Sequence, residues 1–208
     1  MSTPATLGLR GSRTKFDEFQ SVHVLKMEIA HFTVRGVVVD RFCLFVWILA
    51  IMSNDSAAQG QFLPFHRLFV WAHEQALRNE CGFTGTQPYW AEELDVGAFS
   101  ESILLDPVLG FGGDGFGPDR CIRDGPFVNY TNPLGPGFEM TDHCINRQVN
   151  DTLTMTAAPT VVEGCMNMST FLTFWSCIEN RGGPHSAGHS GVGAQVRLPF
   201  HSRLSVCC

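Results

Sequence analysis

Apolar residues recur at helical spacing in three segments of the chain. In residues 15–31, the apolar side chains that follow the period of an amphipathic helix are Phe16, Phe19, Val22, Leu25 and Ile29. Residues 64–80 have the clearest helical pattern, because Pro64 suits a first helical position and Gly82 follows the end. A third helix is predicted over residues 170–179.

The stretch between the second and third of these helices has no sustained period. Residues 91–164 are rich in Gly, Pro, Asp and Asn. A connection of this length in a compact domain is usually a functional or a disulfide-tied loop. The spacing of the cysteines leaves open the pairing among Cys81, Cys121, Cys144, Cys165 and Cys177.

Composition indicates a folded domain and argues against two classes of partner. Of 208 residues, 44% are apolar and only 16% are charged, which is the opposite of the balance in disordered chains. The net charge of −6, without a basic stripe, argues against nucleic-acid binding. The longest apolar run, Phe42 to Met52, is shorter than the roughly 20 residues of a membrane span. We therefore expect no membrane partner, and the alternative of an anchor at residues 37–53 would require resistance to carbonate extraction. The oligomeric state is left open.

The histidines carry most of the candidate chemistry. His185 and His189 are four residues apart, so a helix would place both imidazoles on one face, as a metal-binding pair requires. The glycines around them disfavour a helix, so something else must hold this turn, and a metal could do so. For His73 and His143 we expect an ordinary, partly buried histidine.

Two motifs carry a family resemblance. The segment FLPFHRLFVWAHE has the form F-x-x-[FW]-H-R followed by a glutamate, and its matching residues are Phe62, Phe65, His66, Arg67 and Glu74. The segment GPHSAGHSGVG, residues 183–193, supplies H-x3-H in a glycine-rich stretch. In this order the two motifs resemble the tyrosinase family, specifically its short fungal members, over residues 12–33 and 60–195.

The resemblance implies a mainly α fold, an incomplete four-helix-bundle dicopper domain with long irregular loops. It implies two copper ions as cofactors, each held by three histidines. The first site would use His23, His31 and His66, and the second would begin with His185 and His189.

The resemblance also implies a type 3 copper oxidoreductase that oxidises phenols, o-diphenols or o-aminophenols to quinones with O2. Its partners would be a small phenolic substrate and O2. Glu179 could position water or the substrate proton. Relatives of this kind are secreted, although this sequence shows no signal peptide at its N-terminus.

The sequence departs from the family pattern between the first-site ligands. The family leaves eight residues between its second and third ligands, whereas 34 separate His31 from His66, and removing residues 34–59 restores the spacing. Our hypothesis is that residues 34–59 are a translated intron, which RT-PCR across the junction would test. The alternative is a genuine loop, since long insertions are tolerated thermodynamically.

A second departure follows Gln195. The family continues with a D-P-x-F-x-x-H-H stretch that supplies the last ligand, and His201 lacks that context. We therefore expect a partial copper domain over residues 1–195 and a non-family tail over residues 196–208. A second site without its third ligand predicts little or no oxidase activity. The alternative is a non-catalytic copper-binding fragment or O2-binding module, which would bind one copper or none per chain.

Overall fold

The structure is a computed structural model that describes residues 3–31, 62–135, 139–180 and 182–194. Of residues 26–31 it describes only the backbone. The chain divides into two compact units: the first is Leu25–Pro88, and the second combines Ser2–Val24 with the chain from Tyr89 onward. The predictions for residues 34–59 and 196–208, and the apolar run Phe42 to Met52, lie outside the described residues.

The first unit contains the end of α1 (Lys15–His31) and all of α3 (Phe62–Cys81). Both helices were predicted from their apolar period, and both predictions are confirmed. Helix α3 begins two residues earlier than the position of Pro64 suggests. Proline is tolerated there because the first-turn N–H groups have no partner within the helix.

Polar contacts of α3 hold the segment that follows it. The guanidinium of Arg78 donates to the Glu74 carboxylate, with Nε 2.9 Å from Oε1, and also to the carbonyl of Gly85. The Gln87 N–H donates to the same carboxylate, at 3.0 Å. These contacts fold the chain after α3 back along its last turns.

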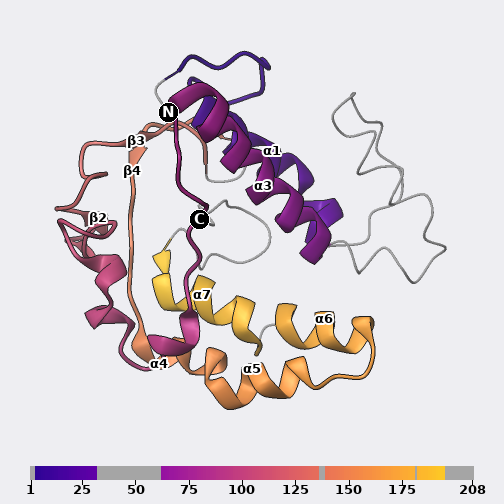
Figure 1. Cartoon of the computed structure of the whole chain (residues 1–208). Coiled ribbons are helices and arrows are strands. Elements are labelled where there is room, and N and C mark those ends of the chain that lie inside the picture. The colour runs from indigo at the N-terminus through magenta and orange to yellow at the C-terminus, as the bar shows by residue number, and fades with distance from the viewer. Residues whose placement is uncertain (1–2, 32–61, 136–138, 181, 195–208) are drawn as a thin grey trace. The chain divides into compact units, whose positions relative to one another are not determined.

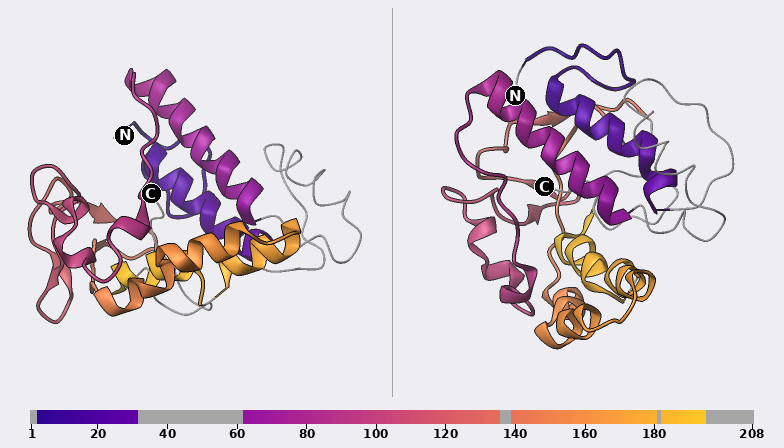
Figure 2. Two further views of the ribbon diagram at one scale, coloured as in Figure 1. Left: turned by 60° about the horizontal axis from the view of Figure 1, so that its bottom comes forward. Right: turned by 45° about the vertical axis from the view of Figure 1, so that its right-hand side comes forward.

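The second unit contains a group of short helices. They are α4 (Asp151–Thr154), α5 (Pro159–Met166), α6 (Phe171–Glu179) and α7 (Pro184–Val192). Helix α7 packs on α4 and α6, and α6 packs on α5 (Figure 1). The orange and yellow helices stay together in both further views (Figure 2). Helix α6 confirms the third predicted helix, with Thr170 as its N-cap.

The long stretch from residue 91 to 164 contains more structure than its sequence predicts. It begins with the single 3-10 turns η2 (Glu92–Leu94), η3 (Phe99–Glu101) and η4 (Ile103–Leu105). Two antiparallel pairs follow: β1 (Gly115–Phe116) with β2 (Cys121–Ile122), and β3 (Thr131–Asn132) with β4 (His143–Cys144). The expectation of irregular structure throughout was wrong for α4, η5 (Met155–Ala157) and α5. Elements of three to eight residues are too short to show a period.

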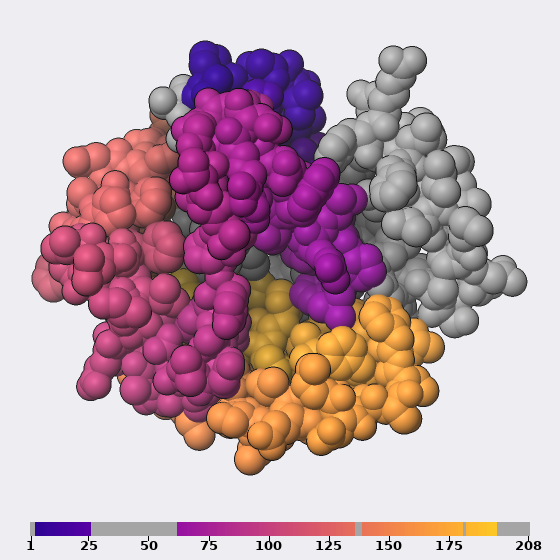
Figure 3. All heavy atoms as spheres, in the orientation of Figure 1, coloured from indigo at the N-terminus to yellow at the C-terminus, as the bar shows by residue number. Residues whose placement is uncertain are grey.

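Disulfides tie the second unit together. In the described residues, Cys121 pairs with Cys144 and joins β2 to β4, which confirms that the long stretch is disulfide-tied. Cys165 pairs with Cys177 and joins α5 to α6. Cys165 is completely buried, whereas Cys81, in the first unit, is exposed and carries a free thiol. The orange surface in Figure 3 includes residues of α5 and α6.

The start of α1 is fixed within the second unit by buried carboxylates. The carboxylate of Asp17 accepts hydrogen bonds from the Thr14 N–H and the Tyr130 hydroxyl, both at 2.8 Å. Glu18 accepts from the N–H groups of Thr6 and Leu7. Burial, with the neighbouring Asp17, raises the pKa of Tyr130. This polar cluster fixes the helical turns that precede His23.

No helix in the described ranges combines the length and the apolar character that crossing a membrane would require.

Candidate metal centre

The histidine pair of α7 is the part of the predicted metal centre that the structure brings together. The rings of His185 and His189 lie with their centroids 4.5 Å apart, in an edge-to-face arrangement. Both side chains are half-buried. The helix thus places both imidazoles on one face, as the spacing in the sequence predicts.

Helix α7 is rich in glycine, and its neighbours explain how it stays helical. A Cβ added at Gly191 would lie 2.6 Å from Cγ2 of Thr154, so α4 approaches α7 closely at this position. The N–H of Asn150 donates to the Gly191 carbonyl at 2.9 Å, and that of Gln148 to the Val192 carbonyl at 3.1 Å. Contacts from α4 and the chain before it therefore support the turn that carries the pair.

His66 is held in a different way, by its own helix. Its Nδ1 lies 2.8 Å from the carbonyl oxygen of Phe62, one turn earlier in α3. Because a carbonyl oxygen only accepts, Nδ1 carries the proton and the lone pair lies on Nε2. The rings of Phe62 and Phe65 pack against the imidazole at centroid distances of 4.5 and 5.1 Å. This tautomer is the one that a metal ligand coordinating through Nε2 requires.

The other predicted site residues are placed individually. His23 lies on α1 in the second unit and is 7% exposed. His31 is the last residue of α1, and the structure describes its backbone only. Glu179 is the last residue of α6 and is half-buried. Among the side chains that the structure describes, no three His, Cys, Asp or Glu residues are grouped to hold a metal.

Reasoning from the sequence missed one acidic residue beside the histidine pair. Burial raises the pKa of Glu92 to about 7, and the charge of Glu93 acts in the same direction. The charge of His189 and a hydrogen bond from the Gly188 amide act in the opposite direction and lower this pKa. A Cβ added at Gly188 would lie 2.7 Å from the Glu92 Oε1. No motif marks this residue, because it comes from a segment far from α7 in the sequence.

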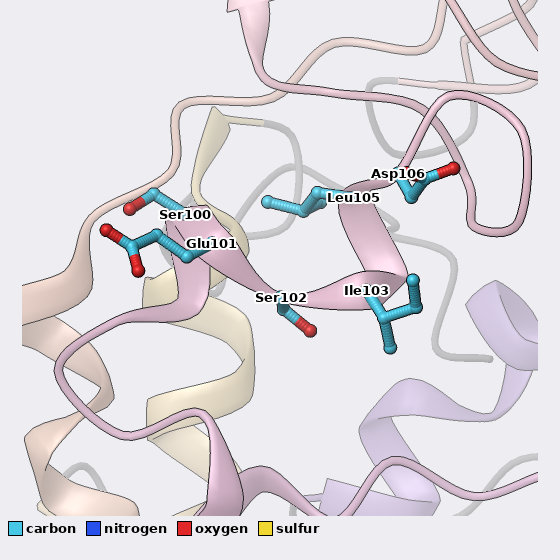
Figure 4. A pocket seen from close by; sticks show the side chains of 6 residues that line it. All are labelled: Ser100, Glu101, Ser102, Ile103, Leu105 and Asp106. Atoms are coloured by element: carbon cyan, nitrogen blue, oxygen red, sulfur yellow. The ribbon is translucent and has the colours of Figure 1, made fainter.

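An open pocket elsewhere in the second unit does not belong to the metal centre. It is formed by η3, η4 and the residues beside them, and Figure 4 shows the lining side chains: Ser100, Glu101, Ser102, Ile103, Leu105 and Asp106. None of these is a histidine. The candidate metal centre therefore rests on the histidines and not on this pocket.

Comparison with known proteins decides the family. The model of the common central domain of tyrosinase matches residues 13–204, which is most of the chain. The chain belongs to the tyrosinase family. Two tyrosinase-like proteins of Diaporthe leptostromiformis are among its relatives. The one called phomQ1 is 36% identical over 62% of this chain and 38% of its own length, and phomQ2 is 30% identical over 83% of this chain and 46% of its own length.

A solved member of the family has the same fold. The polyphenol oxidase (mutant G292N) from Thermothelomyces thermophila matches 92% of this chain and 54% of its own chain, with 25% identity and a TM-score of 0.69. The resemblance to the tyrosinase family and the mainly α fold class are thereby confirmed. This tyrosinase-family chain spans between about a third and about half of the length of these three proteins.

The side chains of this tyrosinase-family chain suit copper as far as they are described. Imidazole nitrogen is a favoured ligand of copper, and a helix that presents two imidazoles on one face supplies two such donors. The Nδ1 contact of His66 to a carbonyl is the kind of outer contact that fixes the tautomer of a metal-ligating histidine. The imidazole pair on α7 and the tautomer of His66 on α3 each fit the binding of copper.

Proposed function

We propose that this chain forms the copper-binding centre of a type 3 copper oxidoreductase that oxidises phenols, o-diphenols or o-aminophenols to quinones with O2. Membership of the tyrosinase family and the likeness to a polyphenol oxidase support the reaction class. The single observation that carries the proposal is the face-sharing pair of imidazoles on α7. Copper bound there would supply the means to activate dioxygen.

The roles of the individual residues follow from their placement. His185 and His189 would hold the second copper ion, and His66, with His23 and His31, the first. The Nδ1–H of His66 donates to the Phe62 carbonyl, so Nε2 is the ring nitrogen that would bind copper.

The acid-base group and the cellular location are also part of the proposal. Glu179, at the end of α6 and six residues before His185, would position water or the substrate proton. The partners would be a small phenolic substrate and O2. The disulfides Cys121–Cys144 and Cys165–Cys177 support folding in an oxidising compartment, and hence secretion.

The proposal is tested by copper content and oxygen uptake of the same samples. The full chain is loaded with copper, freed of excess metal, and analysed for copper per chain and for O2 consumption with catechol. We expect the double variant His185→Ala/His189→Ala to lose one copper per chain and any turnover. His143→Ala, which changes a histidine of β4 outside the predicted ligand set, should change neither.

One outcome would contradict the proposed copper site, and another would favour the alternative function. Copper content that is equal in the wild type and the double variant would contradict a site on α7. One copper ion per wild-type chain that depends on the pair, with no catechol-dependent O2 uptake, would favour the alternative of a non-catalytic copper-binding module, whereas two copper ions per chain would support the oxidase. The little or no turnover expected from a second site without its third ligand remains a prediction, and the same assay measures it.

A further inference from the structure

The segment that carries Glu92 is firmly anchored in the second unit. The carboxylate of Asp95 accepts a hydrogen bond from the indole Nε1 of Trp90 at 2.7 Å and one from the Ser102 hydroxyl at 2.8 Å. The N–H of Gly97 donates to the hydroxyl of Thr154 in α4, also at 2.7 Å. Turn η2 is therefore fixed to the same helix, α4, that supports α7.

The side chain of Glu92 meets α7 at Gly188. This residue lies three positions after His185 and directly before His189, on the turn that joins the two imidazoles. With only 2.7 Å between Oε1 and the position of an added Cβ, a larger residue at 188 would displace the carboxylate. Glycine at this position thus lets the carboxylate lie directly against the helix backbone.

The environment of the carboxylate is unusual for an acidic side chain. Oε2 of Glu92 is inaccessible to solvent and has no hydrogen-bond partner among the residues that the structure describes. Burying a carboxylate oxygen without such a partner is unfavourable unless a positive charge lies nearby. The charge that acts on it from α7 is that of His189, and Glu93 on its own turn adds a repulsive charge. A cation bound by the imidazole pair would offset this cost.

We propose that Glu92 is a positioning residue for the second copper site, whose carboxylate braces α7 at Gly188 and provides a compensating negative charge beside His189. The inference rests on the proposed function, since it assumes that the pair binds copper. Groups outside the coordination sphere that orient metal-ligating histidines are important for binding, and their loss lowers metal affinity about 10–100-fold. Glu92 would be such a group without being a ligand itself, and it would act through the helix backbone at Gly188.

The test compares two neighbouring glutamates. Glu92→Gln keeps the size of the side chain and removes its charge, and Glu93→Gln makes the same change at an exposed position of the same turn. Copper affinity is measured on the full chain by competition with a chromophoric chelator, and the melting temperature of the metal-free protein by circular dichroism. We expect Glu92→Gln to weaken the α7 copper site about 10–100-fold, and Glu93→Gln to leave it within about two-fold.

Two further readouts separate positioning from simple packing. The metal-free Glu92→Gln protein should melt no lower than the wild type, because it loses a buried charge. In the copper-loaded Glu92→Gln protein, the Cu(II) EPR parameters should differ from those of the wild type. Glu92→Asp, which keeps the charge, should recover part of the affinity. Wild-type affinity in Glu92→Gln, or equal weakening in Glu92→Asp and Glu92→Gln, would overturn the inference.

The experiments distinguish a failure of the proposed function from a failure of the proposed role of Glu92. If the His185→Ala/His189→Ala protein binds copper as tightly as the wild type, then the pair is not a copper site and the proposed function is wrong. If the pair is required and Glu92→Gln has no effect, only the role of Glu92 is wrong.

Discussion

Helices α3 and α7 both carry predicted copper ligands, but they are stabilised in opposite ways. On α3, contacts within the helix and the segment after it hold the functional side chains: His66 bonds to the Phe62 carbonyl, and Glu74 pairs with Arg78 one turn later. On α7, glycines weaken the helix, and support comes from α4 and α6, while the carboxylate of Glu92 lies against Gly188. A histidine on a strong helix is thus placed by local sequence, whereas the α7 pair depends on residues far away in the chain.

The strongest test of this comparison removes a distant support of α7. The double variant Cys165→Ser/Cys177→Ser opens the link between α5 and α6, and α6 packs on α7. A disulfide that closes a loop of this size stabilises a fold by about 3 kcal/mol, so we expect a loss of that order in the free energy of unfolding. Urea denaturation followed by circular dichroism measures the loss.

The matched control is Cys81→Ser, which changes an exposed free thiol at the end of α3. It should alter the free energy of unfolding by less than about 0.5 kcal/mol. Equal stability of the double variant and the control would show that α7 does not depend on the α5–α6 link.

A smaller effect is expected at the contact between α4 and α7. In Gly191→Ala the new methyl group would lie 2.6 Å from Cγ2 of Thr154, and overpacking of this kind costs about 1–3 kcal/mol. Gly164→Ala, on α5, is the control, because nothing lies within 4 Å of its added Cβ. That substitution should stabilise the protein by up to about 1 kcal/mol. Melting temperatures that move in the same direction would contradict the close packing at Gly191.

The smallest effect is expected for the local contacts of α3. The Gln87 N–H, and then Arg78, lower the pKa of Glu74 below its ordinary value of 4.5. An acid with a lowered pKa in the folded state contributes stability above its ordinary pKa and loses it as the pH falls through the lowered value. Glu74→Gln should therefore cause a slight destabilisation at pH 7 that disappears in acid, and concentrated salt should reduce the part of it that comes from Arg78. A pH series of melting curves with and without 1 M NaCl checks this. A large, salt-independent loss of stability at neutral pH would contradict the view that α3 is stabilised mainly by its local contacts.

The sequence predicts the helices that are determined by residues close to one another in the chain. The helices at residues 15–31, 64–80 and 170–179 were predictable because their apolar period extends over at least two turns, and the structure confirms them. The spacing of His185 and His189 likewise predicts that both rings share one face, as they do.

The remaining features depend on contacts between distant residues. Helices α4 and α5 have only four and eight residues, so no period marks them. Disulfide pairing cannot be deduced from spacing, and the pair Cys121–Cys144 spans 23 positions. Glu92 belongs to no motif, and its importance emerges only when the fold brings it against Gly188.

The central claim is that the imidazoles of α7 bind copper. Crystals of the full chain grown with copper, with diffraction data collected on both sides of the copper absorption edge, test it directly. We predict an anomalous difference peak between the rings of His185 and His189, within coordination distance of a nitrogen of each. An ordered α7 with no peak at this position, at full copper loading, would contradict it.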